Sequence, residues 1–243
     1  SNPSDEDTVV SITTTTGTAG TDDYTETTVT ATIPAGQTSV DVMIPITDDN
    51  IDEPAEDFTV DGTVTSGNTS NTDPSGTVTI NDNDGAPMLT VGDVTVDETD
   101  GSASVPVSID TPSSVDTVVS ITTTDNSATN PDDYSTTTVT ATIPAGQTSV
   151  NVSIPIIDDA IGEDTEDFTV NGTVTSGNTS NPSDSGTVTI TDNDTPSIVI
   201  GDVTVDEDAG NAVVPVTISN PSDEDTVVSI TTTTGTAGTD DYT

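Results

Sequence analysis

The chain lacks every kind of positively charged side chain. Its 243 residues include no Lys, Arg or His, against 44 Asp and Glu, so the formal net charge is −44. Phosphate clamps and basic patches require Lys or Arg, and we therefore expect no binding to nucleic acid or to anionic membranes. Since no side chain can neutralise the acids, they are either solvated or paired with cations from outside the chain.

Cysteine and tryptophan are also absent, and the aromatic residues are three Tyr and two Phe. Without Cys or His, a disulfide framework, a thiol nucleophile, a Cys/His zinc site and a histidine-based triad are excluded. A glycosidase-like pair of carboxylates is the remaining enzymatic alternative. Because the chain offers almost no aromatic platform and no basic group for a substrate, we expect no enzyme and no small-molecule substrate. No apolar run reaches the length of a membrane span, and we expect no membrane insertion.

Composition alone leaves order and disorder nearly balanced. Leu, Ile, Val and Phe make up about a fifth of the residues, which with this charge is close to the signature of a disordered chain. The pattern decides for order, because the chain is a tandem repeat. The segment TTVTATIPAGQTSV occurs at 27–40 and 137–150, and GDVTVDE occurs at 92–98 and 201–207.

The repeat has a period of about 109 residues, the size of one small β domain. It predicts three segments: residues 1–86, which lack the first strands of a repeat, a complete repeat at 87–195, and the start of another at 196–243. Residues 1–25 are identical to 219–243, whereas the matching part of the middle repeat differs. The repeats therefore alternate, and we call the first and third A-type and the middle one B-type.

Two arrangements explain the incomplete outer repeats. In one, the sequence is a window cut from a longer array of alternating repeats. In the other, the C-terminal strands of one molecule complete the first repeat of the next by donor-strand exchange. The first is favoured, because the overlap of 1–25 with 219–243 duplicates sequence that a donor strand would not need.

Within a repeat, apolar residues alternate with Thr and Ser at the period of two that half-buried strands show. In 137–157 the apolar positions alternate on either side of the PAGQ turn. The pattern predicts all-β tandem sandwiches of the seven-stranded Greek-key, immunoglobulin-like kind. In the middle repeat the predicted strands are 89–98, which can be broken, 103–109, 117–124, 138–143, 149–157, 167–175 and 186–191. The core is expected to be small and to need help from outside for its stability.

Acidic residues recur in fixed register at the predicted strand ends. ITDDNIDEPAEDF (46–58) and IIDDAIGEDTEDF (156–168) each hold six acids. Others lie in VDE, in DDY and in the NDND and TDND segments that end each repeat. Alternate loops of an up-and-down run of strands share one end, so these segments are expected to converge there. Hard cations such as Ca²⁺ take six to eight oxygen ligands, often carboxylates. The alternative is a solvated acidic surface.

The whole chain resembles the Calx-beta domain, on VDE, DY, the DDxxxExxE(D)F segment and the Asp-rich end. The resemblance implies calcium ligands in the middle repeat: Glu98, Asp133, Asp158, Asp159, Glu163, Glu166, Asp192 and Asp194. For the first repeat it implies Asp23, Asp48, Asp49, Glu53, Glu56, Asp82 and Asp84, and for the third Glu207 and Asp241. Asn193 departs from the usual three Asp, which implies fewer or more weakly bound ions. The third site lacks its loop and is expected to be empty or poorly formed. Asp5, Asp61 and Asp223 are interpreted as surface residues.

We expect a structural role, since near-identical repeats suit a spacer. The hypothesis is a calcium-rigidified stalk or filament segment of a giant extracellular protein, on the cell surface or secreted, as in a bacterial adhesin or a biofilm matrix. Its expected partners are neighbouring repeats, through head-to-tail or lateral self-association. The alternative is a calcium-sensing regulatory module of a larger membrane or signalling protein.

Overall fold

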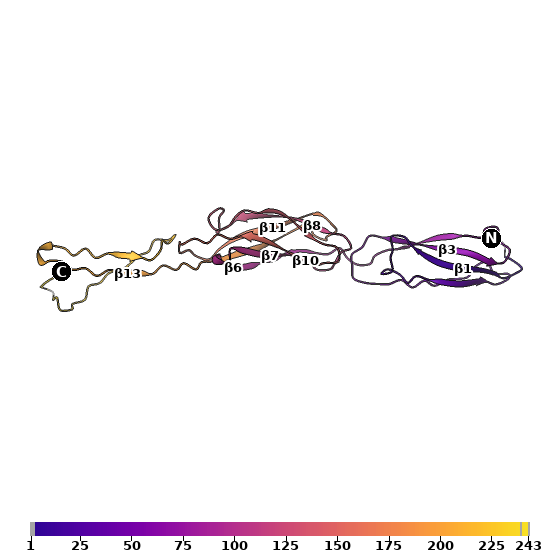
Figure 1. Ribbon diagram of the computed structural model, residues 1–243, viewed down its shortest axis with the longest axis horizontal. Helices are drawn as coiled ribbons and strands as arrows, with labels where there is room; N and C mark the ends of the chain where they lie inside the picture. The colour runs from indigo at the N-terminus through magenta and orange to yellow at the C-terminus, as the bar shows by residue number, and fades with distance from the viewer. Residues whose placement is uncertain (1–2, 239, 243) are drawn as a thin grey trace.

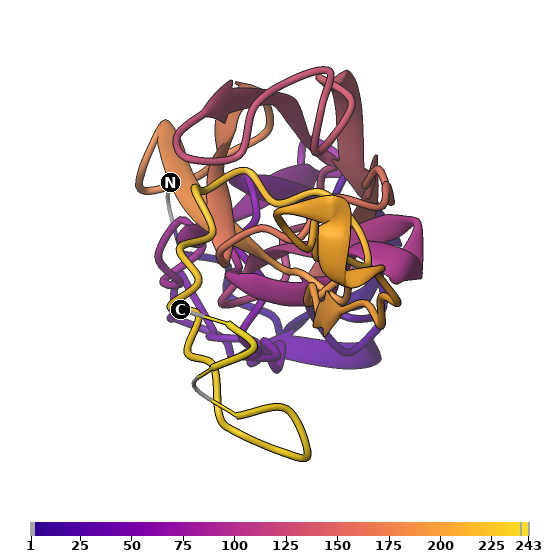
Figure 2. The ribbon, with the colours of Figure 1, turned by 90° about the vertical axis from the view of Figure 1, so that its left-hand side faces the viewer.

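The computed structural model describes residues 3–238 and 240–242. Three repeats follow one another along a rod, and the two termini lie near its opposite ends (Figure 1). Viewed along the rod, the strands of the third repeat lie in front of the first two repeats (Figure 2). In the described part of the chain, the only helices are two short 3₁₀ turns, η1 (Glu98–Asp100) and η2 (Glu207–Ala209). None of the helices found there is long and apolar enough to cross a membrane.

The first repeat forms one antiparallel sheet of four strands in the order β2-β1-β3-β4. Its strands are β1 (Thr8–Thr16), β2 (Thr28–Ile33), β3 (Glu56–Ser66) and β4 (Ser75–Ile80). The segment 39–45, which corresponds to β10 (Ser149–Pro155) in the opposing sheet of the middle repeat, forms no strand here, and no second sheet is present in the described part of the first repeat. The first repeat is therefore half of a sandwich.

The middle repeat is a complete two-sheet sandwich, which confirms the predicted all-β sandwich class. One sheet has the order β10-β7-β5 and the other β6-β12-β11-β8-β9. The strands are β5 (Leu89–Val91), β6 (Val94–Asp97), β7 (Ser102–Ile109), β8 (Thr117–Asp125), β9 (Thr138–Ile143), β10 (Ser149–Pro155), β11 (Glu166–Ser176) and β12 (Ser183–Thr191). The predicted strand 89–98 is broken: β5 joins one sheet, and β6 pairs in parallel with β12 in the other.

The core of the middle repeat follows from strict alternation along its strands. In β7, Ala103, Val105, Val107 and Ile109 are buried, whereas the Ser and Pro residues between them are exposed or half-buried. Val and Ile favour such positions because branched side chains pack well on a pleated surface. Gly172 in β11 faces β5, where an added Cβ would lie 2.8 Å from a methyl group of Val91. This glycine lets the two sheets approach closely.

Each of the first two repeats has one stacked aromatic pair beside its acidic end. Tyr134 and Phe168 stack with ring centroids 3.9 Å apart, and Tyr24 and Phe58 stack at the same distance. All four side chains are fully buried. The pairs fix the DDY turn of each repeat against the first residues of β3 or β11, which carry acids of the site.

The third repeat is an open hairpin of β13 (Ile198–Ile200) and β14 (Val216–Ile218). They correspond to β5 and to the end of β7, but their apolar residues are exposed because no second sheet covers them. As far as the structure describes it, the third repeat thus has the alternating apolar pattern of a strand but no second sheet that would bury its apolar side chains.

Candidate metal centre

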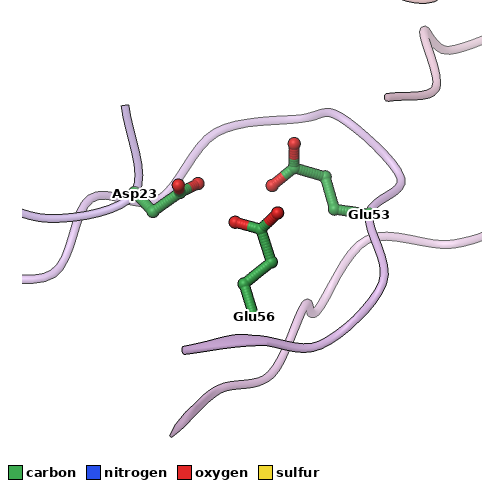
Figure 3. Close-up of side chains that lie close together, drawn as sticks. All are labelled: Asp23, Glu53 and Glu56. Carbon is green, nitrogen blue, oxygen red and sulfur yellow. The ribbon is translucent and has the colours of Figure 1, made fainter. Parts of the chain in front are cut away.

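In the first repeat, three carboxylates from separate segments meet at the end of the sheet that faces the middle repeat. Asp23 lies in the turn between β1 and β2, Glu53 precedes β3, and Glu56 is its first residue. Their side chains point toward one another (Figure 3), and one oxygen of each lies within 4.8 Å of the others. Asp23 is held by the amide of Gly20, which donates to its Oδ2 at 2.6 Å.

Around this group lies a cavity of about 260 Å³. Its lining includes the other four residues predicted for the first repeat, Asp48, Asp49, Asp82 and Asp84. Loop hydrogen bonds position two of them: the amide of Ile51 donates to Asp49 at 2.8 Å, and the amide of Glu53 donates to Asp82 at 3.3 Å. All seven predicted acids of the first repeat thus surround one space.

The middle repeat brings its acids together in two groups. Asp133, Glu163 and Glu166 correspond by position to the group in the first repeat, and their oxygens also lie within 4.8 Å of one another. The second group joins the start of η1 to two loops, and consists of Glu98, Asp158 and Asp194. A small cavity of about 10 Å³ lies between the groups and is lined by acids of both, together with Asp192.

Asp159 and the acids of the third repeat take other positions. The Asp159 carboxylate belongs to neither group of three and accepts from the amide of Ile161 at 2.7 Å, but its charge contributes to the raised pKa of Glu163. Glu207 is exposed in η2, and Asp241 accepts from the amide of Gly238 at 2.8 Å. In the part of the chain that the structure describes, the third repeat contributes no group of three converging acids.

Burial and mutual repulsion raise the pKa of several glutamates. The pKa of Glu98 rises to about 7, mainly through burial and then through the charge of Asp192. Burial and Asp133 raise the pKa of Glu166 to about 7 and that of Glu163 to about 6. In the first repeat, burial and Asp23 raise the pKa of Glu53 to about 7. Ionisation of these glutamates therefore lowers the stability of the folded repeat, unless a cation neutralises their charge.

The chemistry of these residues fits a hard divalent cation. Every converging side chain offers a carboxylate oxygen, the ligand type of Ca²⁺ and Mg²⁺ rather than of Zn²⁺ in its structural sites. Glu98 is only 3% exposed, and its Oε1 has no hydrogen-bond partner. The backbone of Asn193 lowers the pKa of the same carboxyl, but less than burial raises it. A buried carboxylate oxygen without a partner is unfavourable, and an ion would satisfy it.

Sequence analysis did not predict that two further acids, Asp164 and Asp223, lie near these groups. Asp164 lines the small cavity of the middle repeat. Asp223, interpreted above as an ordinary surface residue, is exposed, but its charge contributes to the raised pKa of both Glu163 and Glu166. No motif pointed to Asp223, because its proximity depends on how the third repeat sits on the middle one.

Comparison with known proteins places this acidic architecture in a family. A family model described as the Calx-beta domain matches residues 1–84, 85–194 and 196–243. The chain belongs to the Calx-beta family. It comprises three consecutive Calx-beta segments, the middle of which is a complete sandwich in the structure. No curated protein matches the chain.

Several solved structures are similar to this Calx-beta chain. The apo form of the Calx CBD1 domain is 20% identical, with 45% of this chain and 100% of that one covered and a TM-score of 0.39. CBD12 from CALX1.2 is 17% identical over 78% of this chain and 89% of that one, with a TM-score of 0.36. CBD12 of CALX1.1, described as a calcium binding domain, is 19% identical over 69% of this chain and 67% of that one, with a TM-score of 0.32.

Proposed function

We propose that this chain is a calcium-rigidified structural spacer, a stalk or filament segment of a larger extracellular protein that acts in cell adhesion or in a biofilm matrix. The observation that carries the proposal is the convergence of carboxylates at the ends of two successive repeats in a chain without any Lys, Arg or His. Calcium matches this set of ligands, and a relative in the family is described as a calcium binding domain.

Glu53, Glu56 and Asp23 would hold the ion in the first repeat. In the middle repeat, Glu98, Asp158 and Asp194 would hold one ion, and Asp133, Glu163 and Glu166 another. A bound ion would supply the positive charge that the chain lacks and turn repulsion among these acids into attraction. Since the site forms only in the folded repeat, the binding free energy would add to the stability of the fold.

The location of the acids connects ion binding to stiffness. Loops of the next repeat contact the acidic end of the preceding one, through Asp52 in the first repeat and Gly162 in the middle repeat. Ordering that end with an ion would also order the surface on which the next repeat rests. The proposed partners are therefore neighbouring repeats, in the same chain or in copies that associate head to tail or laterally. We propose no catalytic activity, and a cell-surface or secreted location.

The test is a thermal melt of the chain followed by circular dichroism, in calcium, in excess chelator, and in magnesium after chelation. We expect a large fall in Tm on chelation that calcium reverses and magnesium reverses much less. Small-angle X-ray scattering should then show a longer, stiffer particle in calcium. An unchanged melt would identify the acids as a solvated surface and refute the calcium-stiffened spacer.

The regulatory alternative, a calcium-sensing module, is distinguished by affinity. Extracellular modules bind calcium at about 10⁻⁴–10⁻³ M and intracellular sensors at about 10⁻⁷–10⁻⁵ M. Isothermal titration calorimetry of the chain with calcium should place the middle repeat in the weaker range. Binding in the tighter range would favour the sensor over the spacer.

A further inference from the structure

The first and middle repeats are joined by a buried side-chain contact that needs no ion. Asp52, in the acidic loop of the first repeat, is only 6% exposed. The side-chain amide of Asn178, in the loop between β11 and β12, donates to its two carboxylate oxygens at 2.9 and 3.0 Å. The Ser113 hydroxyl, in the loop between β7 and β8, donates to Oδ2 at 3.3 Å.

The same backbone arrangement occurs at both junctions between repeats. At the first, the amide of Asp52 donates to Pro112 at 3.1 Å, and the amide of Ser114 donates to the Asp52 carbonyl at 3.0 Å. At the second, Gly162 donates to Pro221 at 2.9 Å, and Asp223 donates to the Gly162 carbonyl at 3.3 Å. Asp52 and Gly162 therefore occupy equivalent positions at the two junctions, and so do Ser114 and Asp223.

The side chains at these places differ in a complementary way. Asp52 of the A-type repeat corresponds to Gly162 of the B-type repeat, and Ser114 of the B-type repeat corresponds to Asp223 of the A-type repeat. Each junction thus has one carboxylate at this pair of positions. At the first junction the preceding repeat supplies it, as Asp52, and at the second junction the following repeat supplies it, as Asp223. Gly162 leaves no room for a side chain, because an added Cβ would lie 2.5 Å from Pro196 and 2.7 Å from the carbonyl oxygen of Asp194.

We propose that these two positions form an interface that selects the order of repeats, so that an A-type repeat fits a B-type successor and a B-type repeat fits an A-type successor. If one A-type repeat followed another, both residues joined by these backbone hydrogen bonds would be Asp, and their charges would repel. Two B-type repeats in succession would leave the junction without any carboxylate at this pair of positions. The partner that this surface fits is a Calx-beta repeat of the opposite type, and the selection does not depend on calcium.

The experiment measures the junction directly in the full chain. Because the chain has no cysteine, Thr77→Cys in β4 and Thr142→Cys in β9 place one spin label on each repeat at exposed positions. Double electron–electron resonance in excess chelator then reports the distance distribution between the first two repeats without any contribution from calcium. A narrow distribution is expected for the otherwise unchanged chain.

Ser114→Asp makes the first junction resemble one between two A-type repeats, and we expect the distribution to broaden. Ser114→Asn is the control, similar in size but uncharged, and should keep it narrow. Adding Asp52→Gly to Ser114→Asp recreates the side chains of the second junction and should narrow the distribution relative to Ser114→Asp alone, although the lost contact with Asn178 keeps it broader than in the unchanged chain. A narrow distribution in the Ser114→Asp variant, or no recovery in the double variant, would overturn the proposal. If Ser114→Asp merely unfolded the middle repeat, a substitution in the first repeat would not restore it.

A second pair of variants tests the Asp52–Asn178 contact itself. Asn178→Ala should lower the ratio of molecules in which the two repeats are docked to those in which they are separated. The expected decrease is about tenfold, the size expected for a hydrogen bond to a charged acceptor. Asn68→Ala removes the corresponding exposed residue of the first repeat and should leave the distribution unchanged. Equal effects of the two variants would show that the contact does not hold the junction.

Discussion

The first and middle repeats have nearly the same sequence in their shared strands, but only the middle repeat has a second sheet. The segment Ser149–Pro155 forms β10 there, because β7 pairs with it along its whole length. The matching segment 39–45 of the first repeat forms no strand. Ile156 is 5% exposed, whereas its counterpart Ile46 is 50% exposed. An alternating pattern thus becomes a strand only where another strand pairs with it.

The acidic sites of the two repeats also differ, because of β6 and η1. In the middle repeat, β6 leads into η1 and places Glu98 over the converging acids, leaving a cavity of about 10 Å³. In the described part of the first repeat no side chain takes the place of Glu98, and the cavity there is about 260 Å³. In the middle repeat, β5, β7 and β10 therefore complete the core as a second sheet, whereas β6 and η1, at the edge of the five-stranded sheet, close the site.

Hydrogen exchange should show the largest difference between the two repeats. Alternate amides of 149–154 donate to β7 in a closed sandwich, whereas 39–44 have no partner strand. Without calcium, we expect exchange in 149–155 to be slower by at least about a thousandfold, as for amides that open only with the whole domain. Mass spectrometry of peptic fragments measures both segments in one sample. Similar rates would mean that the first repeat is completed in solution, as donor-strand exchange between copies would do.

The sequence predicted the features that depend on local pattern. The strands from β7 to β12 were expected with their ends within three residues of those observed, because alternation over six or more residues is a strong signal. All the acids that line the cavities except Asp164 were predicted, because they recur at strand ends. The break between β5 and β6 at Gly92 was left open, since both halves read as apolar strand. The missing strand at 39–45 was not foreseen, because its sequence matches that of β10.

The contacts of Asp52 and Asp223 lay outside the reach of sequence reasoning. Both occur among many other acids, and nothing local distinguishes them from solvated ones. Their environment is set by the packing of one repeat against the next, between residues as far apart as Asp52 and Asn178. Only the comparison of the two junctions in three dimensions shows that Asp52 and Gly162 are alternatives at one position.

The stability of the calcium-free middle repeat should fall as pH rises. The folded-state pKa values of Glu98, Glu163 and Glu166 lie at about 7, 6 and 7, above the value of 4.5 for a free glutamate. Between about pH 4.5 and 7 the folded repeat binds more protons than the unfolded chain, so each rise in pH favours unfolding. We expect the free energy of unfolding to fall by more than about 3 kcal/mol, which is the contribution of Glu98 alone. Calorimetry in chelator from pH 5 to 8 measures it.

In saturating calcium the same measurement should give a different curve. Ions replace the protons, so the fall in Tm between pH 5 and 8 should flatten or reverse. In the first repeat, the pKa values of Glu53 and Glu56 are raised, and a shallower dependence is expected there. A Tm of the calcium-free middle repeat that rises with pH would contradict the direction of these shifts.

Substitution of Glu98 should have opposite effects with and without calcium. At pH 8 in chelator, Glu98→Gln removes a buried charge and should stabilise the middle repeat by up to about 3 kcal/mol. In calcium the same variant loses a ligand, and its affinity should fall by at least about tenfold, as even residues that merely orient ligands cost 10–100-fold. Glu207→Gln is the matched control, because Glu207 occupies the same GDVTVDE motif but is exposed. Thermal melts and calcium titrations test both variants, and a destabilised Glu98→Gln variant in chelator would refute the account of the site.

The smallest expected difference concerns one buried hydroxyl in each repeat. The Tyr134 hydroxyl donates to Asp125, whereas Thr16 occupies the matching place in the first repeat and the Tyr24 hydroxyl has no partner. Tyr134→Phe should therefore destabilise the middle repeat by about 1–2 kcal/mol. Tyr24→Phe should be neutral or slightly stabilising, because it removes a buried polar group that has no hydrogen bond. Both changes keep the stacked ring and the packing beneath the acids, so scanning calorimetry of the two variants isolates the hydroxyl. Equal losses in both repeats would mean that the Tyr24 hydroxyl is bonded in solution, and that the aromatic pairs of the A-type and B-type repeats are equivalent.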